Sequence, residues 1–325
     1  MTRVSLAGGT VELPRIILGG HEYLEDGRSR AFNEDLARAV TPGVVFPGFG
    51  GPLRLSVLAR ALELGINAFD VTIDSEKEAL GRNLADIGNL EGAVIQTRPE
   101  GMVYSYDPGN RKMIEPGMLR AEVVRALRLL RREQLDILNI GILSSALDQT
   151  PGFADRLGNV IRELKAEGLV RCAAADTFSG EAAYEAMLST GVFDTINVNF
   201  NIADDGASFS LMRSARDRGV RVVVREVFIK GALFGLAAEA GVTDIAALAR
   251  AAVKFVANQD AVDAIIIGAR SPDELSASVT ASASPVLDTG EAEALERVMA
   301  LPRFLDLRAK NRAAFATPLI SRTTS

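Results

Sequence analysis

Short runs of apolar residues alternate with longer amphipathic segments along almost the whole chain. The apolar runs lack the strict polar alternation of half-exposed strands, which is typical of parallel strands that are buried on both faces. They predict strands over Arg15–Leu18, Ile66–Val71, Ala93–Thr97, Ile137–Ile142, Val170–Ala174, Thr195–Asn199, Arg221–Arg225 and Ala264–Ile267.

The segments between these runs have the apolar spacing of helices that pack one face on a core. Glycines such as Gly65 and Gly168 follow several of them, as is common after the last turn of a helix. The predicted helices span Leu53–Leu64, Ser75–Ile87, Met118–Arg132, Ala154–Glu167, Gly180–Thr190, Ser208–Arg218, Asp244–Asn258 and Pro272–Ala281.

Strand–helix units repeated in this order predict an α/β fold, a (β/α)8 TIM barrel, built as one domain over residues 1–325. An open doubly wound sheet is disfavoured because no G-x-G-x-x-G follows an early strand. Before the first barrel strand, VSLAGGTVEL indicates an N-terminal β-hairpin that turns at Gly8-Gly9. After the barrel, a last helix is expected over Gly290–Ala300, followed by a polar tail.

Two connections between a predicted strand and the next helix are long: His21 to about Gly51, and Arg98 to Gly117. Both leave the carboxyl ends of strands, where barrel enzymes carry out their chemistry. Loops of this length are often functional, so each is either an active-site lid or an insertion that caps the barrel or forms an oligomer contact. The second loop also carries two candidate acids, Tyr104 and Tyr106.

The composition narrows the class of protein. Of the 325 residues 48% are hydrophobic, enough for a large core, and the net charge of −6 argues against a nucleic-acid partner. The single cysteine, Cys172, excludes an internal disulfide and thiolate metal sites. The start of the chain does not resemble a secretory signal, and no segment approaches the ~20 apolar residues of a membrane span. We therefore expect a cytoplasmic protein with no membrane partner.

One segment is more specific than the rest. GINAFDVTIDSEKEALGRNL, residues 65 to 84, resembles the aldo-keto reductase signature G-x-N-x-[FI]-D-T-A-x-x-Y-G with Ser-Glu and Leu-Gly on the helix that follows. IRELKAEGLVRCAAADTFSGEA, INVNFN and IIIGARSPDEL resemble further segments of that superfamily. The resemblance spans nearly the whole chain and implies a barrel plugged by the hairpin, a bound NADP or NAD, and an oxidoreductase activity. The matching residues are Gly65, Asn67, Phe69, Asp70, Leu80 and Gly81.

The catalytic positions of the family are mostly replaced. Of its Asp, Tyr, Lys and His, Asp70 matches, whereas Ser75, Arg98 and Gly141 stand at the other three positions. Arginine does not release a proton near neutral pH, but it binds carboxylates and phosphates in a bidentate manner. We therefore expect a divergent active site in which Arg98 either holds an anionic group or forms a structural pair with Asp70.

The resemblance also implies where a nicotinamide cofactor would bind. Asp176 and Thr177 stand where the family holds the nicotinamide amide with Ser-Asn, Asn197 replaces a glutamine, and Phe200 replaces the tyrosine that stacks on the ring. Other cofactor positions have drifted, to Glu226-Val227-Phe228 and Ala277-Ser278. The residues that stay similar to the family, near the phosphate end, are Gly268, Ala269 and Arg270.

A substitute proton donor is available at the end of the first strand. His21 is the only histidine, and it follows Gly19-Gly20 at a predicted strand end. Its ordinary pKa near 6.5 suits proton transfer, although a lone histidine is equally well an ordinary loop residue. The predicted catalytic set is His21, Asp70, Arg98 and Glu226. No metal site is predicted, because histidine and thiolate ligands are lacking; a carboxylate-only Mg²⁺ site is the open alternative.

Three functions remain open on these grounds. The first is an NAD(P)H-dependent oxidoreductase that acts on a polar or anionic small molecule with a non-standard proton donor. The second is a cofactor-independent lyase, dehydratase or isomerase on the same barrel, using His21, Asp70, Arg98 and Glu226. The third is a non-catalytic binding protein that keeps the fold of an enzyme.

Overall fold

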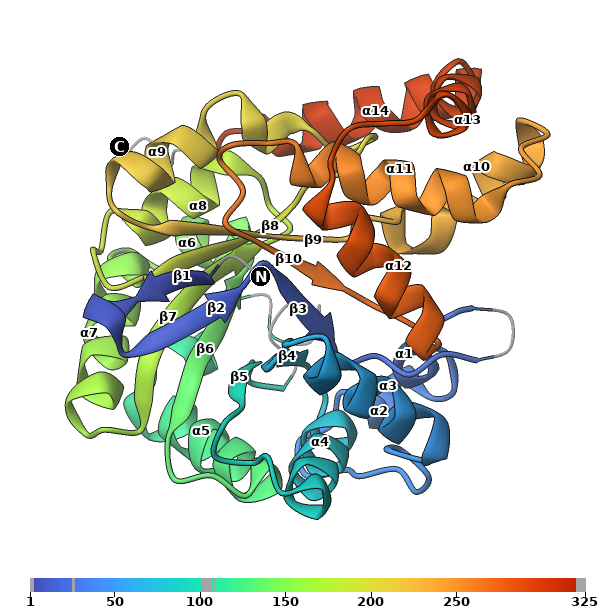
Figure 1. The fold of residues 1–325 in the computed structure, drawn as a ribbon. Coiled ribbons are helices and arrows are strands. Elements are labelled where there is room, and N and C mark those ends of the chain that lie inside the picture. Colours follow the sequence, from blue (N-terminus) through green and yellow to red (C-terminus); the bar gives the residue numbers. More distant parts are fainter. Residues whose placement is uncertain (1–2, 25–26, 101–106, 108, 320–325) are drawn as a thin grey trace.

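The computed structural model describes residues 3–24, 27–100, 107 and 109–319. Within these residues eight parallel strands close into a barrel, in the order β10-β3-β4-β5-β6-β7-β8-β9, so the predicted (β/α)8 barrel is confirmed (Figure 1). Tyr104 and Tyr106 lie outside the described residues. The strands are β3 (Ile16–Gly19), β4 (Ala68–Val71), β5 (Val94–Thr97), β6 (Leu135–Ile142), β7 (Val170–Thr177), β8 (Thr195–Asn199), β9 (Arg221–Arg225) and β10 (Ala264–Ile267).

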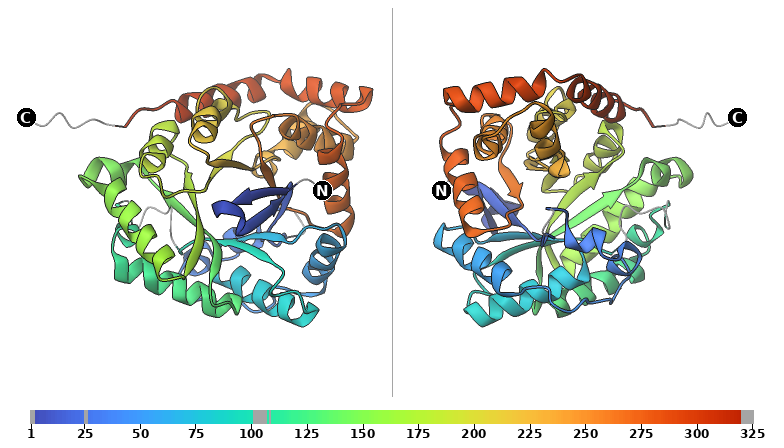
Figure 2. Two further views of the ribbon diagram at one scale, coloured as in Figure 1. Left: turned by 60° about the vertical axis from the view of Figure 1, so that its left-hand side comes forward. Right: turned by 90° about the vertical axis from the view of Figure 1, so that its right-hand side faces the viewer.

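Helices cover the outside of the barrel, as expected for parallel strands buried on both faces (Figures 1 and 2). One helix follows each strand in the predicted order: α3 (Pro52–Glu63), α4 (Asp74–Ile87), α5 (Pro116–Leu130), α7 (Phe153–Ala166), α8 (Glu181–Leu188), α9 (Leu211–Asp217), α11 (Ile245–Ala257) and α12 (Pro272–Ala283). Further helical segments lie in the connections and after the barrel: α1 (Arg30–Asn33), α2 (Leu36–Ala39), α6 (Ser144–Gln149), α10 (Ala232–Glu239), α13 (Thr289–Met299), α14 (Pro302–Phe315), and the short 3-10 turns η1 (Ala7–Gly9), η2 (Arg111–Met113), η3 (Gly206–Ser208) and η4 (Ile229–Gly231).

The N-terminal hairpin lies across one end of the barrel, as predicted (Figure 2). It consists of β1 (Arg3–Leu6) and β2 (Val11–Pro14), paired antiparallel around a turn in which Gly8 and Gly9 have positive φ. Its buried residues Leu6, Val11 and Leu13 join a cluster with the inward-facing residues of the barrel strands, Ile17, Ala68, Ile137, Cys172, Ala174, Val223, Ala264 and Ile266. The hairpin therefore fills the amino end of the barrel with apolar side chains.

The inside of the barrel changes from apolar to polar within one step along the strands. Side chains two residues apart on a strand point to the same face. The residues two positions after inward-facing apolar residues therefore also face inward. Those residues are Asp70 after Ala68, Asn139 after Ile137, Asp176 after Ala174 and Arg225 after Val223, and all four are buried. Since these positions approach the carboxyl ends, the polar layer lies on the face opposite the hairpin.

Two predicted boundaries are wrong for physical reasons. Strand β7 continues past the predicted end at Ala174 to Thr177, because Asp176 and Thr177 are bonded to neighbours inside the barrel. The expected polar tail after residue 300 contains α14, whose only buried side chain among the described ones is Phe304. A helix that is polar almost all round gives no periodic signal. It is held instead by Arg308 and Arg312, which pair with Asp205.

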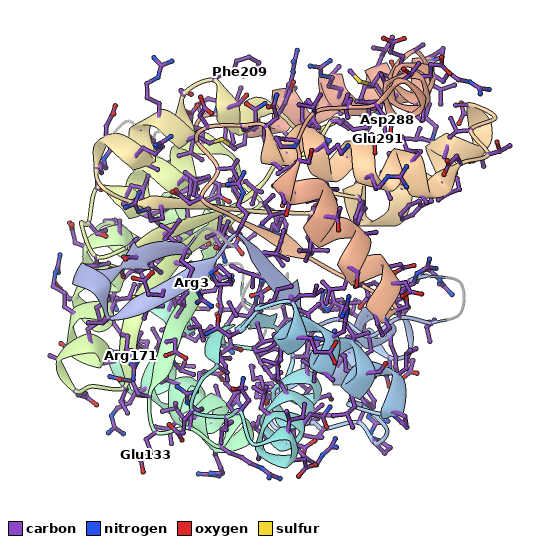
Figure 3. The ribbon with its side chains drawn as sticks, in the orientation of Figure 1. Arg3, Glu133, Arg171, Phe209, Asp288 and Glu291 are labelled. Carbon is purple, nitrogen blue, oxygen red and sulfur yellow. The ribbon has the colours of Figure 1, made fainter. Side chains whose placement is uncertain are left out.

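Local signals set the ends of the neighbouring helix α13. The Asp288 side chain accepts a hydrogen bond from the Glu291 amide, and the Glu291 side chain accepts one from the Asp288 amide. These two reciprocal bonds form a capping box, and both residues are labelled in Figure 3. Glu291 is buried and also pairs with Arg250 and Lys254 of α11. The same carboxylate therefore begins α13 and fixes it to the barrel. Among the helices of the described residues, none combines the length and the apolar character needed to cross a membrane.

The Leu-Gly motif of α4 has a packing role that a single substitution tests. An added Cβ at Gly81 would lie 2.5 Å from the carbonyl oxygen of Leu129 and 2.8 Å from the Cα of Leu130. We predict that Gly81→Ala lowers the free energy of unfolding by about 1–3 kcal/mol, because α5 must move away. Gly235 of α10 is the control, since an added Cβ there meets nothing within 4 Å. Gly235→Ala should raise stability by about 0.5–1 kcal/mol. Equal denaturant midpoints for the two variants would contradict the packing role.

Candidate active site

His21 stands at the carboxyl end of β3 because the backbone before it is held against β4. The Gly20 amide donates to the Asp70 carbonyl at 2.6 Å, and an added Cβ at Gly20 would lie 2.7 Å from Val71 Cγ1. Only glycine allows so close an approach of the two strands. The next residue, His21, therefore projects at the polar end of the barrel, as its sequence position predicted.

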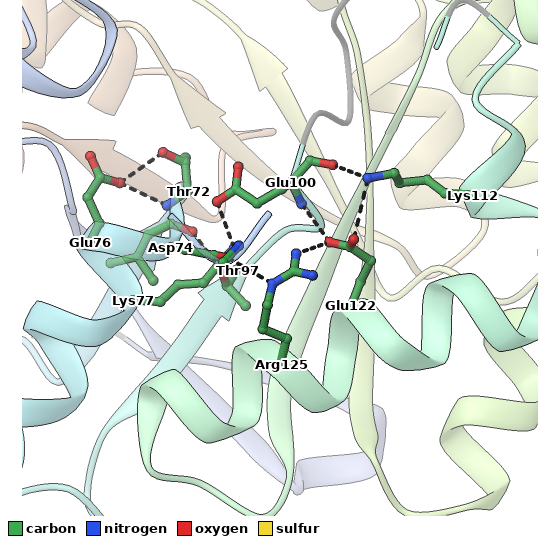
Figure 4. A network of polar contacts seen from close by, with 11 residues as sticks. Thr72, Asp74, Glu76, Lys77, Thr97, Glu100, Lys112, Glu122 and Arg125 are labelled. Carbon is green, nitrogen blue, oxygen red and sulfur yellow. Dashed lines mark hydrogen bonds and ion pairs between the residues drawn. The ribbon is translucent and has the colours of Figure 1, made fainter. Parts of the chain in front are cut away.

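The His21 ring contacts a buried carboxylate that sequence reasoning missed. Nδ1 lies 2.7 Å from Oε1 of Glu76, whose side chain is 1% exposed whereas that of His21 is 33% exposed. Glu76 lies in the first turn of α4, and its other oxygen accepts from the Thr72 amide at 2.9 Å and the Thr72 hydroxyl at 2.8 Å (Figure 4). This contact fixes the ring and leaves Nε2 as the nitrogen directed away from Glu76.

Glu76 raises the pKa of His21, and His21 lowers the pKa of Glu76. Burial alone would lower the pKa of His21, but the charge and hydrogen bond of Glu76, together with the charge of Asp70, raise it above the ordinary value. Burial alone would raise the pKa of Glu76, but His21 and the bonds from Thr72 bring it down to about 2. The contact therefore favours the form of the pair in which a protonated His21 ring lies next to an ionised Glu76 carboxylate.

Asp70 and Arg98 meet in the same polar layer, as the sequence predicted. Gln96 donates to Asp70 at 2.7 Å, while the Arg98 guanidinium lies 4.0 Å from Asp70 and 3.7 Å from Asp176. Both ion-pair distances exceed hydrogen-bonding length. The buried Nε of Arg98 has no hydrogen-bond partner among the described residues. Arg98 thus lies between two aspartates, and its buried Nε donor is not used by any described residue.

The opposite side of the layer is built by Arg225, at the end of β9. Its guanidinium pairs with Asp176 and, at 3.3 Å, with Glu226, and it lies over the Phe178 ring at 4.3 Å from the centroid. Burial opposes this charge, but Asp176, Tyr184 and Glu226 outweigh it and raise the pKa of Arg225. The predicted residue Glu226 therefore lies at the rim beside the Arg225–Asp176 pair.

The segment after β9 has an unusual backbone. Glu226, Ile229 and Lys230 have φ angles of 63°, 55° and 53°, in the left-handed region that favours glycine. For the β-branched Ile229 this is a real strain, of order 1–3 kcal/mol. Strain of this kind persists where surrounding contacts enforce it, and here Glu226 is tied to Arg225 and Lys230.

Several buried amides in the barrel have polar atoms without a partner. Neither Oδ1 nor Nδ2 of Asn197 is bonded to any described residue, although the residue is 0% exposed. Oε1 of Gln96 and Oδ1 of Asn139 are also unpartnered there, while the Asn139 amide donates to Asp176 at 3.2 Å. Buried polar groups nearly always have partners, so these atoms point to ligand or solvent. A single polar residue near the carboxyl end of an otherwise apolar strand is the signal that could have identified Gln96 and Asn139.

Ser75, at the tyrosine position of the family, has a structural contact. It is 0% exposed, and its hydroxyl accepts from the Phe46 amide at 2.9 Å, while Asp74 accepts from the Gly43 amide at 2.7 Å. The first long loop is therefore held on the start of α4. Ser75 takes no part in the polar layer around Asp70 through any contact among the described residues.

A buried ionic network supports the second long loop where it leaves β5. Lys77 pairs with Asp74 at 2.8 Å and Glu100 at 3.3 Å, and Arg125 of α5 pairs with Asp74 and with Glu122 (Figure 4). Burial is the main cause that raises the pKa of Glu100 to about 8. The network joins α4, α5 and the end of β5, so it fixes the strand end that carries Arg98.

The predicted cofactor residues differ in whether their side chains already have partners within the protein. The Asp176 carboxylate forms an ion pair with Arg225 and accepts a hydrogen bond from Asn139, and the Thr177 hydroxyl donates to the Ile142 carbonyl at 2.7 Å. The Phe200 ring is 1% exposed and stacks on Phe255 with centroids 5.6 Å apart. Asn197 is the member of this group whose side chain forms no hydrogen bond with any described residue.

The phosphate end of the family's cofactor site is covered by the first loop. An added Cβ at Gly268 would lie 1.9 Å from the Tyr23 hydroxyl, and Ala269 is buried. Arg270 pairs with Glu274 at 2.6 Å, and its side chain is 54% exposed. No group of three potential metal-ligating side chains occurs in the part of the chain that is described.

The His21–Glu76 contact is testable because the chain has a single histidine. We predict that Glu76→Gln lowers the pKa of His21, because the variant loses the carboxylate charge that opposes burial. An NMR titration of the His21 ring measures this directly. Glu78→Gln is the matched control, since Glu78 contacts Arg82 instead. The contact is disproved if the His21 titration is the same in wild type and Glu76→Gln.

Comparisons with known proteins agree with this architecture. The sequence profile of the Aldo/keto reductase family matches residues 52–241. The solved aldo-keto reductase AKR11C1 from Bacillus halodurans (holo form) is similar with a TM-score of 0.65 and 19% identity, over 92% of this chain and 96% of that one. The glycerol dehydrogenase AKR11B4 from Gluconobacter oxydans is similar with a TM-score of 0.63 and 19% identity, over 92% and 95%. No curated protein sequence gives a significant match. This chain belongs to the aldo/keto reductase family.

Proposed function

We propose that the protein is an NAD(P)H-dependent oxidoreductase of a polar or anionic small molecule, in which His21 replaces the family's tyrosine as proton donor. Family membership supports an oxidoreductase. The observation that carries the choice of donor is the 2.7 Å contact between His21 Nδ1 and the buried Glu76 carboxylate. This contact favours the protonated form of the ring and orients it at the carboxyl end of the barrel, where barrel enzymes act.

In this proposal His21 moves one proton. When a carbonyl is reduced, its oxygen gains negative charge and needs a proton from a group with a pKa near neutral. Nε2 of His21 donates that proton to the oxygen, and the alcohol forms. The neutral ring that remains keeps its hydrogen bond from Nδ1 to Glu76. In the oxidative direction the neutral ring takes the proton back. A bound nicotinamide would supply or accept the hydride.

Arg98 is proposed to bind the negative charge of the substrate. Its guanidinium is only 14% exposed and lies beyond hydrogen-bonding distance from Asp70 and Asp176. A carboxylate or phosphate in the layer would complete its donor set with a bidentate contact. Asp70, held by Gln96, keeps Arg98 between the strands, and Glu226 with Arg225 forms the far wall.

The fit of a nicotinamide cofactor differs between its two ends. Asn197 has both polar atoms of its amide unpartnered within the described residues, which suits a carboxamide ligand. At the other end Gly268, Ala269 and Arg270 would receive phosphate once Tyr23 has moved from Gly268. Phe200 would need to leave Phe255 to stack on a ring. We therefore propose NADP or NAD as the cofactor, with Asn197 and Arg270 as its main polar contacts.

The position of Tyr23 favours one alternative. If Tyr23 stays on Gly268, the mouth keeps His21, Asp70, Arg98 and Glu226, and the Tyr23 hydroxyl occupies the space beside Gly268 that the proposed phosphate contact needs. These residues would then serve as acid, base and anion clamp of a cofactor-independent lyase, dehydratase or isomerase. A non-catalytic binding protein is less favoured, because the ion pair between His21 and the buried Glu76 leaves one ring nitrogen available for proton transfer.

The redox proposal is tested by cofactor titration and by one variant. We expect NADPH or NADH to bind below millimolar concentration in a fluorescence titration. His21→Gln should lower kcat/KM for carbonyl reduction by about 10²- to 10⁴-fold, the usual contribution of a general acid, while cofactor affinity stays unchanged. Glu78→Gln serves as the control. Binding of neither cofactor, with turnover of a substrate in its absence, would instead establish the lyase or isomerase alternative.

A further inference from the structure

A cavity separate from the proposed active site lies beside the polar layer, between the barrel and the last described helix, α14. It has a volume of about 140 Å³ and is bordered by the ends of β7 and β8 and by α14. A single water molecule needs only about 10–15 Å³ of such space, so the cavity has room for a small organic molecule. None of the residues assigned above to proton transfer lines it.

The hydrogen-bond donors that line this cavity are directed at the protein backbone. The Tyr184 hydroxyl donates to the Asn197 carbonyl at 2.6 Å, and the Thr177 hydroxyl donates to the Ile142 carbonyl at 2.7 Å. The Asn311 amide of α14 donates to the Ala203 carbonyl at 2.9 Å. The lining therefore offers few donors to a ligand.

The acceptors that line the cavity are only partly used, because the one hydrogen bond between the side chains of Asn199 and Asp204 leaves an Asn199 oxygen unbonded. Oδ1 of Asn199 is buried and has no hydrogen-bond partner among the described residues. Asp204 lines the same cavity and forms no ion pair with a cation of the described chain, whereas its neighbour Asp205 pairs with Arg308 and Arg312. A half-buried carboxylate without a counter-ion is unfavourable unless a cation arrives from outside.

The pKa of Asp204 reflects this deficit of positive charge. Burial is the largest cause that raises this pKa, and the charges of Glu226 and Asp205 add to it, so that the pKa rises to about 6. Asn199 and Arg225 act in the opposite direction without cancelling the effect. A bound cation would restore the charged form of Asp204.

The end of α14 adds negative potential to the same place. An added Cβ at Gly180 would lie 2.5 Å from the Phe315 carbonyl oxygen and 2.9 Å from that of Ala314, so the last carbonyls of this helix point at a residue of the lining. A helix carboxyl end attracts cations. The rings of Phe178 and Phe315 form apolar parts of the wall. The surroundings thus combine acceptors, a helix carboxyl end and apolar surface.

We propose that this cavity binds the ammonium group of a small organic amine, with Asp204 as counter-ion and Asn199 Oδ1 as a hydrogen-bond acceptor. The short alkyl part of the amine packs against Phe178 and Phe315. The site requires neither the nicotinamide cofactor nor turnover. Its failure would leave the redox proposal intact, and loss of the redox proposal would leave this site intact.

The test compares two probes of equal size on the full chain without cofactor. Isothermal titration calorimetry at pH 7.5 should give tighter binding of butylammonium than of 1-butanol. Asp204→Asn, which keeps the shape of the side chain, should weaken butylammonium by about tenfold, the loss expected for one charge-assisted contact, and leave 1-butanol unchanged. The exposed Asp217 gives the matched control, Asp217→Asn, which should bind both probes as the wild type does.

The wild type provides an independent measurement in case Asp204→Asn does not fold. At pH 5, one unit below the pKa of about 6, most Asp204 is protonated, so butylammonium should bind about tenfold more weakly than at pH 7.5. Binding of 1-butanol should not change between these pH values. Equal affinities of the wild type for the two probes, or an Asp204→Asn variant that binds butylammonium as tightly as the wild type, overturns the proposal.

Discussion

The contact between the His21 ring and the buried Glu76 carboxylate is the interaction on which the account of the active site depends. Glu76 is held by two bonds from Thr72 and by the start of α4, so its charge is fixed in place. A fixed anion in a site of low polarity outweighs the cost of burying a cation beside it. The carboxylate thereby orients the ring and favours its charged form, and a positioned acid needs both properties.

The fold and part of the site were predictable from the sequence. Buried parallel strands have a recognisable apolar pattern, and Gly19-Gly20 placed His21 at a strand end, where the structure brings it together with Asp70 and Arg98. Glu76 was not found because its partner is 55 residues away, and their contact exists only once the loop and α4 have packed. The cavity beside Asp204 was equally hidden, because α14 has almost no apolar face to reveal it.

The site departs from the family in a physically coherent way. The tyrosine position has become an anchor for the first long loop, since the Ser75 hydroxyl holds the Phe46 amide. That same loop brings His21 to Glu76 and Tyr23 to Gly268. The packing of this one loop on the barrel therefore accounts for all three contacts.

The pH dependence of kcat/KM for carbonyl reduction by the wild type tests the central claim most directly. Because Glu76 raises the pKa of His21, the protonated ring that we propose as the donor persists to higher pH than in a free imidazole and is lost as the pH rises through that pKa. We predict that log kcat/KM is constant below the pKa that NMR gives for His21 and falls with unit slope above it. A profile that stays flat through the His21 titration would show that this histidine donates no proton in the reaction.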